Sequence, residues 1–190
     1  MHRRTPFVVF STALLLTAVG ACSAERRSPP VADAACFGTR VLSFEDLRAE
    51  VFIPAAEPCE RGTFSVVFTR GGDTVATLAE TREGTVGFIG IADLNADGRG
   101  EFFVATHTAD SAARGALFGY TDRAGSIERF PIAPLDSAQL AGYAGHDRFG
   151  FGGVDQLVRA FPRGGADTVW FGYSFAQNRW RSVARPNWVR

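Results

Sequence analysis

The sequence contains no lysine: all 20 of its Lys and Arg residues are arginine. We attribute this bias to codon usage in a GC-rich genome. The arginines are balanced by 20 Asp and Glu residues, and no basic stripe is visible along the chain. Proteins that bind nucleic acids concentrate positive charge on one face, so this composition argues against a nucleic-acid partner.

Histidine is also scarce, because only His107 and His146 remain after the first 21 residues. A zinc site needs several ligands at usable spacing, and the sequence has no Gly-x-Ser-x-Gly elbow to present a nucleophile. We therefore predict that the protein is not an enzyme. The alternative is an envelope enzyme of unrecognised type, in which His146 and Asp147 would converge with a remote nucleophile in a cleft.

The sequence lacks an apolar run of the ~20 residues that a membrane-spanning helix requires. A shorter run, Phe7–Leu16, follows two arginines, as in the signal peptide of an exported protein. Small residues then lead directly into Cys22, and this pattern resembles the lipobox of bacterial lipoproteins. The resemblance implies that residues 1–21 are removed and that Cys22 carries a lipid anchor. Because residue 23 is Ser and not Asp, the expected location is the periplasmic face of the outer membrane, with ordinary secretion as the alternative.

Residues 22–35 are rich in Arg, Ser, Pro and Ala, as in a flexible tether. One domain is expected over residues 36–190, which is long enough to bury a single core. With Cys22 lipidated, Cys36 and Cys59 remain as a pair in an oxidising compartment, and we predict that they form a disulfide. Such a bond would stabilise the fold by roughly 3 kcal/mol in the chain-entropy model. Two buried free thiols are the alternative.

Short apolar or alternating runs separated by Gly, Asp and Pro indicate an all-β domain. Residues 63–69 and 74–78 are predicted to form a hairpin around Gly-Gly-Asp, and residues 169–175 alternate with a period of two. We expect an antiparallel β-sandwich of roughly eight to ten short strands, with a barrel as the alternative closure. One short helix is expected at residues 136–141, capped by Asp136, and residues 45–50 are a weaker candidate for a helical turn.

The segment from Asp93 to Glu101 resembles the start of a calcium-binding loop, in which side chains bearing oxygen alternate before a glycine. The predicted Ca2+ ligands are Asp93, Asn95, Asp97, the backbone carbonyl of Arg99, and Glu101. The alternative is an ion-free turn in which Asp93, Asn95 and Asp97 accept hydrogen bonds from backbone N–H groups. If calcium binds, the protein would be a calcium-stabilised binding or scaffold module of the envelope without inhibitory activity.

Three segments resemble the periplasmic inhibitors of i-type (invertebrate-type) lysozyme in their order and spacing. They are residues 87–104, which contain Asp-Leu-Asn-Ala-Asp-Gly, residues 142–149, which read Gly-Tyr-Ala-Gly-His-Asp-Arg-Phe, and residues 157–162. The resemblance covers about residues 62–184. The second segment is the most distinctive, and a structural role is expected for its polar residues Tyr143, His146, Asp147 and Arg148.

The resemblance implies a β-sandwich that inserts an exposed loop into the sugar-binding cleft of a lysozyme. In the family this loop is rich in Ser and Gly and carries a Tyr. The corresponding stretch here is residues 106–115, where Ser111 matches and the tyrosine position holds Ala113 or Arg114. The predicted contact residues are Thr108, Asp110, Ser111 and Arg114, with a solvated hairpin tip as the alternative. The expected partner is an i-type lysozyme. For the oligomeric state, both a monomer and a homodimer are compatible with the sequence.

Overall fold

The computed structural model describes residues 38–153, 156–164 and 167–186. Over these ranges the chain forms twelve β-strands, and neighbouring strands pair in antiparallel fashion. The predicted all-β antiparallel sandwich is therefore confirmed, with more strands than the eight to ten expected. Within the same ranges, no helix is long and apolar enough to cross a bilayer.

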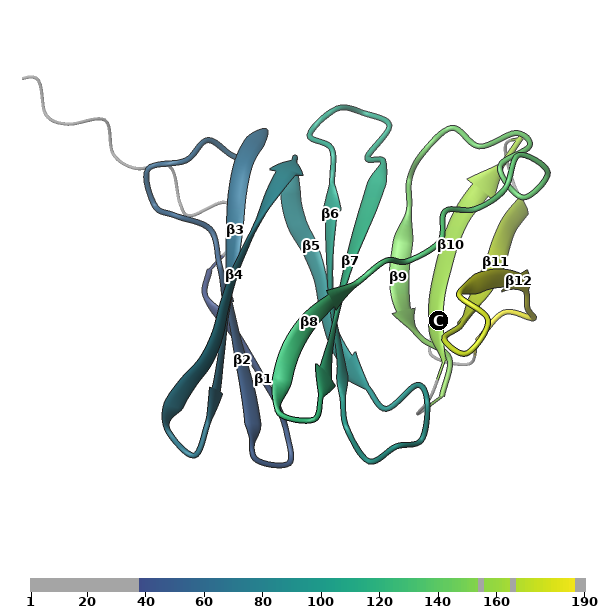
Figure 1. The fold of residues 1–190 in the computed structure, drawn as a ribbon. Coiled ribbons are helices and arrows are strands. Elements are labelled where there is room, and N and C mark those ends of the chain that lie inside the picture. The colour runs from purple at the N-terminus through teal and green to yellow at the C-terminus, as the bar shows by residue number, and fades with distance from the viewer. Residues whose placement is uncertain (1–37, 154–155, 165–166, 187–190) are drawn as a thin grey trace, which may run out of the picture. The chain divides into compact units, whose positions relative to one another are not determined.

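The strands form three four-stranded sheets, and each sheet is a meander of strands that are consecutive in the sequence (Figure 1). The first sheet contains β1 (Arg40–Phe44), β2 (Leu47–Phe52), β3 (Arg61–Arg70) and β4 (Asp73–Glu83). The second sheet contains β5 (Thr85–Ala92), β6 (Glu101–His107), β7 (Gly115–Arg123) and β8 (Ser126–Phe130). The third sheet contains β9 (Arg148–Phe151), β10 (Leu157–Arg163), β11 (Asp167–Ser174) and β12 (Arg179–Ser182).

The second sheet lies between the other two and is buried on both faces. Successive side chains of a strand point to opposite faces, and β6 shows this with two neighbouring phenylalanines. The ring of Phe102 packs edge-on against Phe68 of the first sheet at 5.1 Å between centroids. The ring of Phe103 packs against Phe151 of the third sheet at 6.1 Å. The fold is thus a stack of three layers with a hydrophobic core on each face of the second sheet, which adds one layer to a simple sandwich.

The short helix predicted at residues 136–141 is wrong, because this segment consists of turns. Its capping interactions nevertheless exist: the Gln139 N–H donates to Asp136 Oδ1 at 2.8 Å, and the Asp136 N–H donates to Gln139 Oε1 at 3.0 Å. This reciprocal pair is a capping box. One helical bond follows, from the Leu140 N–H to the Asp136 carbonyl at 2.9 Å, but the Ala141 and Tyr143 N–H groups then donate to carbonyls only three positions earlier, and the segment does not continue as an α-helix.

The second helical candidate, residues 45–50, is also wrong, because these residues form the turn and the first part of β2 in the β1–β2 hairpin. Glu45 has a φ of 51°, which places the turn in the left-handed region. Leu47, Ala49 and Val51 then alternate as buried residues of β2. Their spacing of two is that of a strand with one buried face.

Several predictions concern segments outside the described residues. These are the signal peptide at residues 1–21, the lipidated Cys22, the tether at residues 22–35, and Cys36. Cys59 lies within the described ranges and is disulfide-bonded. Because Cys36 is not described, its pairing with Cys59 stays a prediction.

Candidate functional site

The predicted contact loop connects β6 to β7, and we call its residues 108–114 the tip loop (Figure 1). Asp110, Ser111 and Arg114 are exposed, whereas Ala112 and Ala113 are half-buried. The loop follows directly from His107, the last residue of a strand that is buried on both faces. A rigid strand therefore ends in a short polar loop whose charged side chains face solvent.

The tip loop is closed at its neck by Thr108 and Arg114. The Thr108 N–H donates to the Arg114 carbonyl at 2.9 Å, and the Arg114 N–H donates to the Thr108 hydroxyl at 2.8 Å. These two bonds extend the pairing of β6 and β7 by one step beyond the strands. The loop is consequently a compact turn whose two ends are hydrogen-bonded to each other.

Asp110 organises the interior of the tip loop. Its Oδ1 accepts hydrogen bonds from the Thr108 hydroxyl at 2.7 Å and from the N–H groups of Ala112 and Ala113 at 3.2 and 3.1 Å. The Thr108 hydrogen bond is the main cause that lowers the pKa of Asp110, with contributions from the Ala113 N–H and from Arg114. A carboxylate that accepts several hydrogen bonds in a turn is committed to the turn, so Asp110 shapes the loop.

Arg114 and Ser111 are less constrained. Arg114 Nη1 lies 3.3 Å from Asp110 Oδ2, and the two side chains are 56% and 53% exposed. Exposed ion pairs contribute at most ~1 kcal/mol and exchange readily with water or another anion. No hydrogen bond of the Ser111 hydroxyl is recorded within the described part of the chain. These two side chains can therefore donate to an external acceptor.

The base of the tip loop rests on the buried carboxylate of Asp147, which immediately precedes β9. Asp147 Oδ2 accepts a hydrogen bond from the Gly115 N–H at 2.7 Å, and Oδ1 accepts one from Arg159 Nε at 2.6 Å. The Tyr143 hydroxyl also donates to Oδ2. Burial is the first cause that raises the pKa of Tyr143 to about 12, and its bond to Asp147 adds to the shift. We call Asp147, Tyr143, Arg159 and Gly115 the Asp147 brace.

The backbone around Asp147 also binds the tip loop. The His146 N–H donates to the Ala112 carbonyl at 2.5 Å, and the Asp147 N–H lies 3.4 Å from the Ala113 carbonyl. The approach is so close that a Cβ on Gly145 would meet the Ala112 oxygen at 2.0 Å. Because Gly145 has a φ of +99°, only glycine fits this position without strain.

The four polar residues of the segment 142–149 occupy different structural positions. Tyr143 and Asp147 belong to the brace, whereas His146 is exposed and Arg148 lies over the ring of Trp170 at 5.7 Å from its centroid. The Asp147 carboxylate is fully buried and pairs with Arg159, and no hydrogen bond joins it to the His146 ring among the described contacts. The arrangement does not form the base and orienting carboxylate that the enzyme alternative requires.

The predicted calcium loop, between β5 and β6, is held by hydrogen bonds from its own backbone. Asp93 accepts from the N–H groups of Asp97 and Gly98 at 3.1 and 2.9 Å. Asn95 Oδ1 accepts from the Asp97 N–H, and Asp97 Oδ1 accepts from the Arg99 N–H, both at 2.9 Å. Across the described residues, no three His, Cys, Asp or Glu side chains are grouped so that they could hold a metal ion. These hydrogen bonds are the ones expected for the ion-free turn, and calcium binding stays a prediction to be tested.

Glu101 lies at the end of this loop and is completely buried. Its Oε2 accepts the Leu94 N–H at 2.7 Å, and Thr121 lies 3.4 Å from its Oε1. Burial is the largest cause that raises its pKa to about 7, and the nearby Asp97 and Asp93 raise it further. Glu101 therefore holds the loop against β6, and burial makes it ionise near neutral pH.

No protein-family model matches the chain, and no curated protein matches it. Two solved structures are similar to part of it. One is PliI from Aeromonas hydrophila in complex with Meretrix lusoria lysozyme: it is 17% identical with a TM-score of 0.45, over 50% of this chain and 82% of that chain. The other is PliI-Ah, a periplasmic inhibitor of I-type lysozyme from the same species: it is 18% identical with a TM-score of 0.46, over 53% and 95%. Such inhibitors are the class that the sequence motifs resemble.

Arg159 is the member of the brace that sequence reasoning missed. Arg159 lies in residues 157–162, one of the three segments that resemble the inhibitor family. Nothing in the sequence alone assigned a role to this charged residue between apolar neighbours. The signal was present, because an arginine inside a buried strand needs a partner for its charge. The side chain is only 15% exposed, and its partner is Asp147, twelve positions earlier.

Proposed function

We propose that this protein is a lipid-anchored inhibitor of the cell envelope, which binds a lysozyme of the i-type and blocks its cleft with the tip loop. The observation that carries the proposal is a loop whose tip is exposed while its base is fixed by the buried Asp147 brace. A preorganised loop loses little conformational freedom on binding, so more of the contact energy appears as affinity. Binding residues are commonly presented on such loops by a rigid scaffold.

The chemistry of the tip supports a glycosidase cleft as the receptor. Glycosidases hydrolyse their substrates with a pair of carboxyl groups. Arg114 can exchange its weak contact with Asp110 for a carboxylate of the enzyme and form a charge-assisted hydrogen bond, to which Ser111 adds a hydroxyl donor. Ala112 and Ala113 add only small side chains to the loop.

The proposal includes export and anchoring. Removal of residues 1–21 and lipidation of Cys22 place the domain at the periplasmic face of the outer membrane, on the tether of residues 22–35. A disulfide between Cys36 and Cys59 closes the start of the domain. Mass spectrometry of the purified protein tests the acyl groups on Cys22, and a mobility change on reduction tests the disulfide.

The experiment for inhibition is a muramidase assay with the c-, g- and i-type lysozymes, each run with and without the full chain. The proposal expects a dose-dependent fall in the rate of the i-type enzyme at about micromolar protein, where the free energy of binding is near −8 kcal/mol. Unchanged rates for all three enzymes would remove the inhibitor function. Inhibition of the c-type enzyme alone would remove the assignment to i-type lysozyme.

A further inference from the structure

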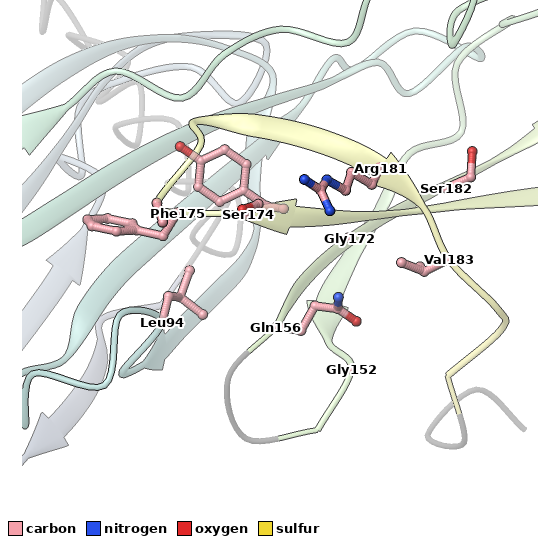
Figure 2. A pocket seen from close by; sticks show the side chains of 11 residues that line it. Leu94, Gly152, Gln156, Gly172, Ser174, Phe175, Arg181, Ser182 and Val183 are labelled. Carbon is pink, nitrogen blue, oxygen red and sulfur yellow. The ribbon is translucent and has the colours of Figure 1, made fainter.

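A cavity of about 490 Å3 opens beside the third sheet, where β11 ends and β12 runs back along it (Figure 2). It is lined by both polar and apolar side chains, which include Leu94, Gln156, Gly172, Ser174, Phe175 and Arg181. Leu94 comes from the loop between β5 and β6, so the cavity joins two sheets. Its volume lies within the range of ~300–1,000 Å3 that is usual for small-molecule sites.

The polar side chains that line this cavity can each donate hydrogen bonds, and one of them, Arg181, is positively charged. Arg181 is exposed, and its Nη2 donates to the neutral Oε1 of Gln177, which also accepts from Arg179 Nε at 2.8 Å. Among the described residues that line the cavity, none is Asp or Glu. Within the described ranges, no carboxylate oxygen is paired with Arg181 as a salt bridge. The guanidinium therefore brings to the cavity a positive charge that no carboxylate of the described residues pairs with.

Gly172 brings the other donors close to Arg181. The two residues are cross-strand partners in the β11–β12 pairing. A Cβ on Gly172 would meet Gln156 Nε2 at 2.6 Å, so the absence of a side chain leaves room for the Gln156 amide. Figure 2 shows the guanidinium of Arg181 and the amide of Gln156 near Gly172, with Ser174 on the neighbouring part of the strand. A guanidinium, an amide and a hydroxyl thus border one space.

We propose that this cavity binds a small molecule that carries an oxyanion, either a carboxylate or a phosphate, together with an apolar group. Arg181 provides the charge and a planar pair of donors, which match the two oxygens of such an anion. Leu94 and Phe175 provide the apolar surface for the rest of the molecule. A cavity whose described lining holds one cation and no carboxylate attracts anions more than cations or neutral analogues.

The oxyanion site is separate from the tip loop. Leu94 belongs to the loop that precedes β6, and the tip loop follows β6, so the two sites lie at opposite ends of a seven-residue strand. A strand of that length spans ~20 Å or more. The oxyanion site therefore does not depend on the proposed inhibition, and each function can fail without the other.

The test is a titration of the isotope-labelled full chain, followed by the amide NMR signals of Gly172 and Ser182. Three probes share one ring: benzoate carries a carboxylate, phenyl phosphate carries a phosphate, and benzamide is neutral. We expect saturable shifts of these signals with benzoate or phenyl phosphate below about 10 mM, where weak small-ligand binding is measurable. The response of the two anions decides between carboxylate and phosphate. Equal shifts with benzamide, or no saturable shift with either anion, would overturn the proposal.

Two variants and a control assign the binding to the cavity. Arg181→Gln should weaken binding of the responding anion at least about tenfold, because it removes the charge. Gly172→Ala should also weaken binding, because its Cβ would meet Gln156 Nε2 at 2.6 Å and the amide would have to leave its present position. Arg179→Gln is the matched control, since Arg179 shares the strand and the contact with Gln177 but does not line the cavity. An equal loss in Arg179→Gln and Arg181→Gln would show a general charge effect and contradict the site.

Discussion

The Asp147 carboxylate lies 2.7 Å from the Gly115 amide nitrogen, and this hydrogen bond joins residues 32 positions apart in the sequence. Gly115 begins β7 directly after the tip loop, while Asp147 leads into β9 of the third sheet. The bond therefore couples the base of the tip loop to a different layer of the fold. Because the same carboxylate pairs with Arg159 in the interior, the position of the loop depends on a buried charge.

Asp147→Asn is expected to lower the free energy of unfolding by about 3 kcal/mol, since it leaves the buried Arg159 without its counter-charge. Chemical denaturation of the two proteins measures the difference. Glu128→Gln is the control, because Glu128 belongs to an exposed pair with Arg123 at 3.8 Å, and it should change stability by less than about 0.5 kcal/mol. Equal stability of Asp147→Asn and the parent protein would mean that the brace is not a stabilising contact.

Gly145→Ala tests the close approach between the two loops. The added Cβ would meet the Ala112 oxygen at 2.0 Å, and backbone must move to relieve the contact. Gly72→Ala is a matched control, because Gly72 has nearly the same φ, +100°, with nothing within 4 Å of its Cβ position. We expect thermal unfolding to show a clearly larger loss of stability for Gly145→Ala. Similar losses in both variants would attribute the effect to backbone strain alone.

Glu101 makes stability depend on pH. Burial raises its pKa from 4.5 to about 7 in the folded chain, so the folded protein holds the proton more tightly than the unfolded one does. The contribution of this proton to the free energy of unfolding is fully present below about pH 4.5 and is lost as the pH rises to about 7. The total loss is roughly 3 kcal/mol. Relative to the parent protein, Glu101→Gln should therefore gain stability over this window. A stability difference that stays constant between these pH values would contradict the assignment.

The loop of residues 93–101 is expected to be stable without an ion. Its carboxylate and amide oxygens already accept hydrogen bonds from backbone N–H groups, and these bonds close the turn without a cation. We expect no heat and no rise in melting temperature when the full chain is titrated with calcium to about millimolar levels. A saturable heat that disappears in Asp93→Asn would establish a calcium site instead.

Much of the fold follows from local patterns in the sequence. The hairpin of β3 and β4 was predicted from two alternating runs around a glycine-bearing turn, and the pairing of Arg70 with Asp73 confirms it. The third layer was not predicted, although the sequence of β6 indicates a strand that is covered on both faces. Residues 102–105 read Phe-Phe-Val-Ala without alternation, and such a continuous apolar run is typical of a strand that is buried on both faces.

In the candidate site, too, the features that depend on local contacts were predictable, and those that depend on distant contacts were not. The position of the tip loop follows from the strands that flank it, and its turn follows from Asp110 and Thr108, which are close in sequence. The brace depends on Asp147, Arg159 and Gly115 meeting across two sheets, and no local pattern specifies which strands become neighbours. The oxyanion cavity was missed for the same reason, because Leu94 lies in a loop of the second sheet and Arg181 lies in a strand of the third sheet.

The most direct test of the central claim compares tip-loop variants in the inhibition of an i-type lysozyme. Ser111→Ala and Arg114→Gln should each raise the concentration needed for half-inhibition by about tenfold or more, while the melting temperature stays nearly constant because these exposed side chains bury little surface. Arg123→Gln, an exposed arginine at the far end of β7, should inhibit like the parent protein. Parent-like inhibition by both tip-loop variants would contradict the claim that this loop enters the cleft.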